Sequence, residues 1–105
     1  MTDRQIVKFA SSFRDGILDG NPSQYMCAAV CWPLAALLRC CGVECESVES
    51  DLADELGMLH ANHIWIRLAD GRALDPTADQ FNRFGYEYPP VYLGPPAELH
   101  RAPLP

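Results

Sequence analysis

Apolar residues recur every three or four positions along the start of the chain, and this spacing predicts an amphipathic helix. The apolar face consists of Ile6, Phe9, Ala10, Phe13 and Ile17. Thr2, followed three positions later by Gln5, forms a capping-box pattern, so the helix should begin at Asp3. Gly20 and the Asn-Pro pair after it should end the helix. We expect this helix to be a packing element.

A second apolar segment predicts a helix from about Tyr25 to Cys41, with Ser23 as its cap and Gly42 as its stop. Its expected buried stripe is Cys27, Val30, Leu34, Leu37 and Cys41. Pro33 costs about 3 kcal/mol inside a helix but little in the first turn. The helix is therefore either kinked near its start or preceded by a looser turn that holds Cys27. Both arrangements leave the thiol near a helix N-terminus.

The alternation of apolar and polar residues from Val43 to Val48 predicts a strand. The acidic stretch from Glu49 to Gly57 is interpreted as a short helix capped by Ser50. A short strand is expected at 91–93, and a proline-rich extended tail should then cover the domain. The predicted fold class is α+β, with N-terminal helices packed on a small antiparallel sheet.

A hairpin is predicted over residues 62–81, where strict alternation places Ile64, Ile66 and Leu68 on one face and His63, Trp65 and Arg67 on the other. A two-residue loop would pair Ile66 with Asp75. A three-residue loop, Ala69 to Gly71, would instead pair Ile66 with Leu74 and Trp65 with Asp75. Only the second register keeps Leu74 with the buried residues. It also brings Asp75 to the face of His63, within reach of the imidazole.

The composition is that of an ordinary globular protein: 105 residues, 49% hydrophobic and 21% charged, with a net charge of −6. We expect a single domain over 1–105, made of an N-terminal helix (1–20), a core (23–93) and a tail (94–105). The acidic balance argues against a nucleic-acid partner. No apolar run is long enough to span a membrane, and no export signal is recognised at the start. Five cysteines, an odd number, favour free thiols in the cytoplasm.

Cys27, His63 and Asp75 are the candidate catalytic residues. A helix N-terminus and a nearby imidazole would stabilise the thiolate of Cys27, which is the reactive form of a thiol. His63 would act as base and then as acid, while Asp75 would fix its tautomer. The main-chain N–H of Cys27, with the side-chain amide of Gln24 or Gln80, would bind the oxyanion. This chemistry requires no cofactor. Each residue also has a purely structural interpretation, because buried cysteines and strand histidines are common.

Two alternatives remain open at this stage. Cys31 is a rival nucleophile one turn along the helix, and His60 is a rival base. The four residues Cys27, Cys31, His60 and His63 could instead bind a structural zinc ion, although their spacing matches a zinc finger only loosely. In that case the chain would be a non-catalytic protein-interaction module, as it would be with a vestigial triad.

Three motifs resemble small bacterial and phage proteins of the papain-like and transglutaminase-like cysteine enzyme superfamily. Tyr25-Met26-Cys27, followed by Cys31, Pro33 and Leu34, resembles the start of the helix that carries the nucleophile. His63-Ile64-Trp65 resembles the His-x-Trp of transglutaminase-like domains. The run DGRALDPTADQF, at 70–81, resembles the segment that ends in the acid of the triad. The order Cys, His, Asp is that of the superfamily.

The resemblance implies Cys27 as nucleophile and a helix packed on an antiparallel sheet that carries the base and the acid. It implies a hydrolase or acyltransferase acting on an amide, as a peptidase, deamidase or transglutaminase-like enzyme. The expected partner is a peptide or protein substrate, with a protein partner or a second copy of the chain left open. Gln24, Gln80 and Trp65 are the expected oxyanion and substrate-binding residues. The substrate is not specified by the sequence.

Overall fold

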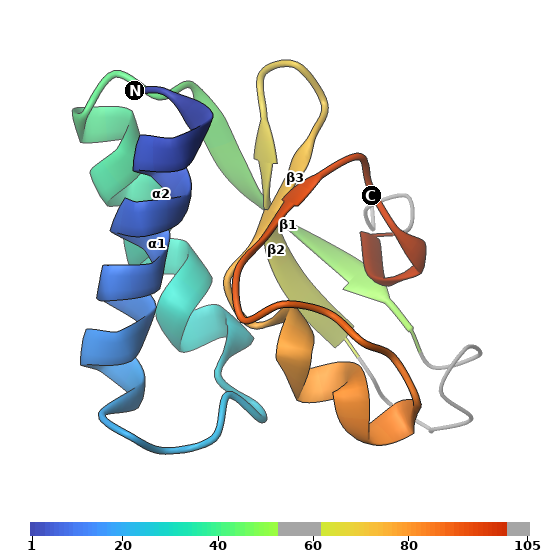
Figure 1. The fold of residues 1–105 in the computed structure, drawn as a ribbon. Coiled ribbons are helices and arrows are strands. Elements are labelled where there is room, and N and C mark those ends of the chain that lie inside the picture. Colours follow the sequence, from blue (N-terminus) through green and yellow to red (C-terminus); the bar gives the residue numbers. More distant parts are fainter. Residues whose placement is uncertain (53–61, 101–105) are drawn as a thin grey trace.

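The computed structural model describes residues 1–52 and 62–100, which form two α-helices, a four-stranded sheet and two 3₁₀ helices. The elements in chain order are α1 (Asp3–Leu18), α2 (Cys27–Cys40), β1 (Cys45–Asp51), β2 (Asn62–Leu68), β3 (Ala73–Asp75), η1 (Ala78–Phe84), β4 (Tyr92–Gly94) and η2 (Glu98–His100). Figure 1 shows α1 and α2 together on one side of the sheet, with η1 and η2 towards the other side. The predicted α+β fold class is confirmed.

The helix α1 begins as the sequence predicts. Thr2 and Gln5 form the reciprocal capping box, and Asp19 adopts a left-handed conformation after the last turn. Ile6, Ala10 and Leu18 are buried. Arg14 is also buried, which the apolar pattern does not predict.

The helix α2 begins two residues later than predicted. Met26 occupies the N-cap position in place of the predicted Ser23, whose hydroxyl donates to Asp79 (2.7 Å). The predicted apolar stripe is also partly wrong, because Leu37 and Cys41 are exposed. The buried residues are Val30, Cys31, Leu34, Ala35 and Leu38. Pro33 lies inside the helix on its exposed side, so Cys27 occupies the first turn of a continuous helix rather than a separate loop.

The sheet has the order β1-β2-β3-β4, with every neighbouring pair antiparallel. Ile66 pairs with Leu74, as the three-residue loop requires, and Gly71 is left-handed at φ +89°. The strand predicted at 43–48 is present but shifted: β1 starts at Cys45 and continues to Asp51, so the acidic helix predicted from residue 49 is wrong at its start. The rest of that expected helix from residue 53 on lies outside the described residues, as does the rival base His60.

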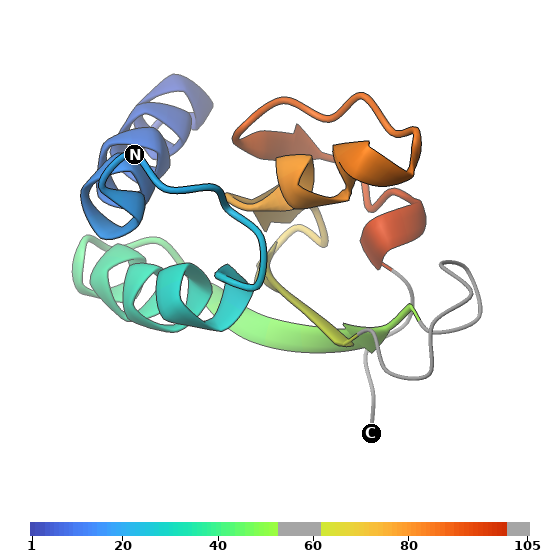
Figure 2. The ribbon, with the colours of Figure 1, turned by 90° about the horizontal axis from the view of Figure 1, so that it is seen from below.

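The end of the described chain departs from the predicted extended tail. The expected strand at 91–93 is present as β4, pairing with β3. After it, residues 98–100 form the 3₁₀ helix η2, whose Leu99 and His100 are buried. Figure 2, seen from below, shows η2 lying beside the sheet on the side away from α1. This segment therefore contributes to the interior as well as covering it.

Two apolar clusters divide the interior. The larger lies between the helices and the sheet and consists of Ile6, Ala10, Cys31, Leu34, Ala35, Leu38, Cys45, Ile64, Ile66, Leu68 and Leu74. The smaller, Leu52, Ala78, Phe81 and Leu99, joins η1 and η2. The candidate site described below borders the smaller cluster, because the ring of His63 contacts Phe81. None of the helices in the described ranges is long and apolar enough to cross a membrane.

Candidate active site

Cys27 is the first residue of α2, and its side chain is half-buried. No side chain among the described residues caps this end of the helix. Two residues earlier, Tyr25 has a positive φ of 64°, which is strained for a residue with a Cβ atom. Its main-chain N–H donates to Oε1 of Gln80 (3.2 Å), which holds the strained turn in place. The thiol of Cys27 thus lies at an uncapped helix N-terminus, directly after the turn at Tyr25 that Gln80 holds.

His63 is fully buried in β2, beyond the part of that strand that pairs with β3. The ring of Phe81 meets it edge-on at 4.7 Å between centroids. Nε2 lies 2.6 Å from Oδ2 of Asp75, so the predicted meeting of acid and imidazole is present. Nδ1 is buried, and within the described ranges it has no hydrogen-bond partner of standard geometry. This nitrogen is therefore available to exchange a proton with another group.

Cys27 and His63 act on each other electrostatically. Burial opposes the thiolate, but the neighbouring His63 and the main-chain N–H groups of Ile64 and Ala28 outweigh it, and the pKa of Cys27 falls below its ordinary 9.0. Burial likewise opposes an imidazolium, but the charge and hydrogen bond of Asp75, aided by Cys27, raise the pKa of His63 from 6.5 to about 9. The two opposite shifts favour a thiolate–imidazolium pair.

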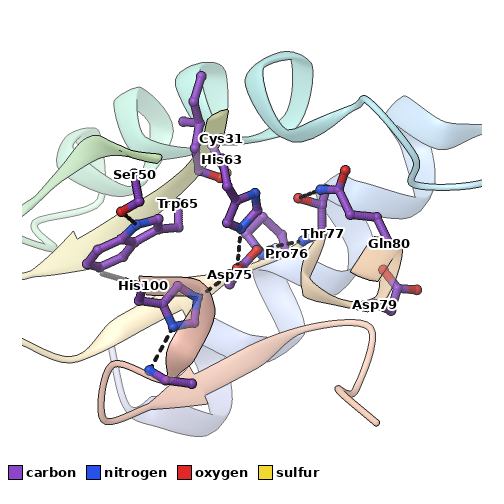
Figure 3. A network of polar contacts seen from close by, with 12 residues as sticks. Cys31, Ser50, His63, Trp65, Asp75, Pro76, Thr77, Asp79, Gln80 and His100 are labelled. Carbon is purple, nitrogen blue, oxygen red and sulfur yellow. Dashed lines mark hydrogen bonds and ion pairs between the residues drawn. The ribbon is translucent and has the colours of Figure 1, made fainter. Parts of the chain in front are cut away.

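Asp75 is the last residue of β3 and is completely buried. Its Oδ2 contacts Nε2 of both His63 (2.6 Å) and His100 (2.7 Å), and its Oδ1 accepts the main-chain N–H of Thr77 (3.1 Å). Figure 3 shows the two imidazoles reaching the carboxylate from different sides. Burial alone would raise the pKa of Asp75, but His63 and His100 reverse the effect and hold it far below its ordinary value.

Arg14 fixes the segment that follows Asp75. Its guanidinium makes a bidentate ion pair with Asp79 (2.9 Å for both contacts) and also donates to the main-chain oxygens of Pro76 (3.0 Å) and Pro90 (2.7 Å). A planar guanidinium satisfies several acceptors at once, which explains how this charge is tolerated inside the protein. These contacts of Arg14 join α1 to η1 and to Pro76, the residue directly after Asp75.

Cys31, the rival nucleophile, lies in a different environment. It is fully buried, and its Sγ donates to the main-chain oxygen of Ile64 (3.3 Å). Burial, the charge of Asp75 and the proximity of Cys27 raise the pKa of Cys31 well above 9.0. Its thiol is therefore protonated at neutral pH, which disfavours a nucleophilic role.

The three residues expected to bind the oxyanion or the substrate differ in burial and in their contacts. Gln80 bridges Thr77, to which its amide donates (3.0 Å), and the main chain of Tyr25. Gln24 is half-buried beside Tyr25 and interacts with its hydroxyl. Trp65 is buried, and its indole N–H donates to Ser50 (3.0 Å). Its burial leaves little of its surface for contact with a substrate. Of the three, Gln80 is the one tied to the turn before Cys27.

His100 was not predicted from the sequence to belong to the site. It comes from η2, at 4% exposure, and its ring packs against Trp65 (4.9 Å between centroids) and Tyr92 (5.4 Å). A single histidine in a proline-rich segment gives no periodic or motif signal. Only the folding of the chain end onto β3 reveals it.

The expected zinc ligands do not come together in the described part of the chain. Cys31 is engaged with Ile64, and His60 lies outside the described residues. Within residues 1–52 and 62–100, the only acidic, histidine and cysteine side chains grouped closely enough for a metal are His63, Asp75 and His100, whose ligand atoms lie within 4.8 Å of one another. Their separations of 2.6 and 2.7 Å are hydrogen-bond lengths.

No protein family, curated protein or solved structure matches this chain. What the site does must therefore be inferred from its own geometry.

Proposed function

We propose that this protein is a cysteine-nucleophile amide hydrolase or acyltransferase, related in mechanism to papain-like and transglutaminase-like enzymes. Cys27 is the nucleophile, His63 the base and acid, and Asp75 the residue that orients His63. The observation that carries the proposal is the buried contact of the Asp75 carboxylate with Nε2 of His63, beside which the half-buried thiol of Cys27 has a pKa that His63 lowers. A merely structural cysteine in an apolar core would show a raised pKa, as Cys31 does.

The reaction begins with attack of the Cys27 thiolate on the carbonyl carbon of an amide. The C–O π electrons move to oxygen, and the oxyanion lies near the main-chain N–H of Cys27 at the start of α2. The imidazolium of His63 gives its Nδ1 proton to the leaving amine as the C–N bond breaks. A thioester on Cys27 and a neutral His63 remain.

The second half of the reaction regenerates the thiolate. A water molecule or an amine attacks the thioester, and Nδ1 of His63 takes its proton. The C–S bond then breaks, releasing a carboxylic acid after attack by water or a new amide after attack by an amine. Asp75 stays ionised throughout and stabilises the imidazolium of His63.

The proposed substrate is a peptide or a protein side chain, because the Cys27 side chain is only half-buried and a large substrate can reach it. A hollow of about 660 Å³ along α1, lined in part by Arg4, Val7 and Arg72, includes none of the three catalytic residues. We place the protein in a reducing compartment such as the cytoplasm, because its five cysteines are free thiols and the mechanism requires one of them to be reduced. A protein partner that completes the substrate site is compatible with the exposed Trp32 on α2.

Selective alkylation tests the proposal. The folded protein is treated briefly with iodoacetamide at about pH 6, where an ordinary thiol is almost entirely protonated, and modification is mapped by peptide mass spectrometry. Cys27 should be labelled well ahead of the exposed Cys40 and Cys41, which serve as internal references. The selectivity should vanish in His63→Ala and persist in Cys31→Ala. Equal labelling of Cys27 and Cys40 in the wild type would contradict the enzyme and favour a non-catalytic interaction module.

A second measurement separates hydrolysis from transfer. A glutamine-rich protein substrate is incubated with the chain and a biotinylated primary amine. Incorporation of biotin indicates acyl transfer to the amine, release of ammonia without incorporation indicates deamidation, and new amino termini indicate peptide hydrolysis. Cys27→Ala is the control for all three.

A further inference from the structure

The carboxylate of Asp75 is shared by two histidines, of which the mechanism above uses one. His100 reaches the same Oδ2 from η2, at the far end of the described chain. Figure 3 shows His100 on the side of the carboxylate away from His63, next to Trp65. A second imidazole at this position requires an explanation, because burying an additional titratable ring is costly unless its hydrogen bonds are satisfied.

The protonation of His100 follows from its other contact. The main-chain N–H of Ala97 donates to Nδ1 of His100 (3.0 Å). A main-chain N–H can only donate, so Nδ1 must hold a lone pair. The proton of the neutral ring therefore lies on Nε2, which donates to Oδ2 of Asp75. In this arrangement His100 is neither an imidazolium nor a metal ligand, because Nε2 has no lone pair to offer.

We infer that His100 is a positioning residue of the catalytic site: as a neutral Nε2–H donor, locked by Ala97, it holds the carboxylate of Asp75 ionised and oriented towards His63. The inference rests on the proposed function for its catalytic consequence. The fixed tautomer itself depends only on the contacts of His100.

The physical reason is that the carboxylate is fully buried. Without donors it would be neutral, and a neutral Asp75 could not stabilise the imidazolium of His63. Two imidazole N–H groups on Oδ2 and the N–H of Thr77 on Oδ1 replace its lost water shell. Because η2 and the Thr77 turn fix the carboxylate from two directions, its plane cannot rotate away from Nε2 of His63. Among the described residues, the charge of Asp75 also helps to raise the pKa of Cys31 and of Tyr88, after burial in both cases.

Nitrogen NMR of the wild-type protein tests the tautomer directly. In a ¹H–¹⁵N experiment through the ring protons at about pH 7, Nδ1 of His100 should show the shift of an unprotonated nitrogen and Nε2 that of a protonated one. A ring proton on Nδ1 would overturn the inference whatever the catalytic activity proves to be.

A pair of variants tests the role. His100→Gln keeps an N–H donor for Asp75, whereas His100→Leu keeps an apolar side chain among the rings of Trp65 and Tyr92. If His100 positions the carboxylate, the rate of Cys27 alkylation at about pH 6 should fall about tenfold in His100→Leu and recover largely in His100→Gln. A packing role predicts the reverse order, because Leu fits an apolar pocket better than Gln. Rates are compared at equal folded fraction, measured by circular dichroism.

The two proposals fail separately. If wild-type Cys27 shows no selective labelling, the enzyme proposal fails, while the NMR measurement still decides the donor state of His100. If Cys27 is labelled selectively but His100→Leu reacts as fast as His100→Gln, the enzyme proposal stands and the positioning role is wrong.

Discussion

The two cysteines at the start of α2 are one helical turn apart and face the same residue of β2, yet their pKa values shift in opposite directions. The thiol of Cys31 donates to the carbonyl of Ile64, is fully buried and has a raised pKa. The thiol of Cys27 meets the N–H of Ile64 and the ring of His63, is half-buried and has a lowered pKa. An acceptor favours the thiol, and a donor favours the thiolate.

The comparison shows that burial and neighbouring groups separate the two thiols: burial and the charge of Asp75 raise the pKa of Cys31, whereas His63 and nearby main-chain N–H groups lower that of Cys27. Helix position alone would treat both as thiols near an N-terminus. The buried Cys31 also attaches the start of α2 to β2, which brings Cys27 to His63. In this arrangement one cysteine serves structure and the other serves the proposed chemistry. Four experiments test whether the two cysteines differ in this way.

The largest effect is expected when the thiol of Cys27 is removed, with removal of the Cys31 thiol as the matched comparison. Cys27→Ala should abolish the rapid alkylation and reduce turnover of an amide substrate by at least about 10⁵-fold, since a nucleophile has no substitute. Cys31→Ala should retain rapid alkylation within about threefold. Peptide mass spectrometry after a short iodoacetamide pulse measures both. If rapid labelling is lost in Cys31→Ala while Cys27→Ala retains it, the two roles are reversed.

Asp75→Asn should have the next largest effect. An amide can donate to Nε2 of His63, which moves the ring proton to Nδ1 and removes the base that faces Cys27. The pKa of Cys27 should then return towards its ordinary value, and its alkylation rate at about pH 6 should fall about 100-fold. The pH–rate profile of alkylation measures this change. An unchanged profile in a folded variant would show that Asp75 does not act on the thiol through His63.

Removal of the Cys27 thiol should expose a pH-dependent stability due to His63. Although burial lowers it, the pKa of His63 is raised from 6.5 to about 9, chiefly by Asp75. The contribution of His63 to the free energy of unfolding is therefore complete below about pH 6.5 and is lost as the pH rises through about 9. The lowered pKa of Cys27 opposes this trend in the wild type. Denaturant unfolding of Cys27→Ala should therefore lose up to about 3 kcal/mol between about pH 6 and pH 10.

The control for that measurement is Cys27→Ala combined with His63→Phe, which lacks the titrating ring. Its unfolding free energy should vary much less across the same pH range. An equal pH dependence in the two proteins would assign the effect to groups other than His63.

The smallest effect is expected for the structural thiol. Cys31→Ala leaves the carbonyl of Ile64 without its donor and creates a small cavity, so the free energy of unfolding should fall by about 1–2 kcal/mol. Cys31→Ser, whose hydroxyl can donate to the same carbonyl, should lose less than Cys31→Ala. Urea denaturation measures both. A stability loss in Cys31→Ser that exceeds the loss in Cys31→Ala would show that the contact with Ile64 contributes little.

The sequence predicts those features that depend on local spacing. The capping box of Thr2 and Gln5 sets the start of α1, and the requirement to bury Leu74 sets the hairpin register that brings Asp75 to His63. Both depend on residues close together in the chain. The α+β class follows from the same patterns.

The features that were not predicted depend on distant contacts. Ser23 has the residue type of a helix cap, but Asp79 offers a charged acceptor, so its hydroxyl bonds there. The buried face of α2 is set by where β2 lies, which the periodicity of one helix cannot specify. Arg14 and His100 are buried because residues more than twenty positions away provide their partners. Cys27 likewise reaches His63 across a long stretch of chain, and the catalytic role of the triad stays a prediction.

The junction at Asp75 joins β2, β3 and η2, and thus residues that a ribosome synthesises at well separated times. While residue 100 is still inside the exit tunnel, the carboxylate has no contact with His100, although α1, α2 and the hairpin can already be folding. A nascent chain would therefore contain Cys27, His63 and Asp75 before the carboxylate of Asp75 contacts His100. Completion of this interior contact is among the last events that synthesis of the described chain allows.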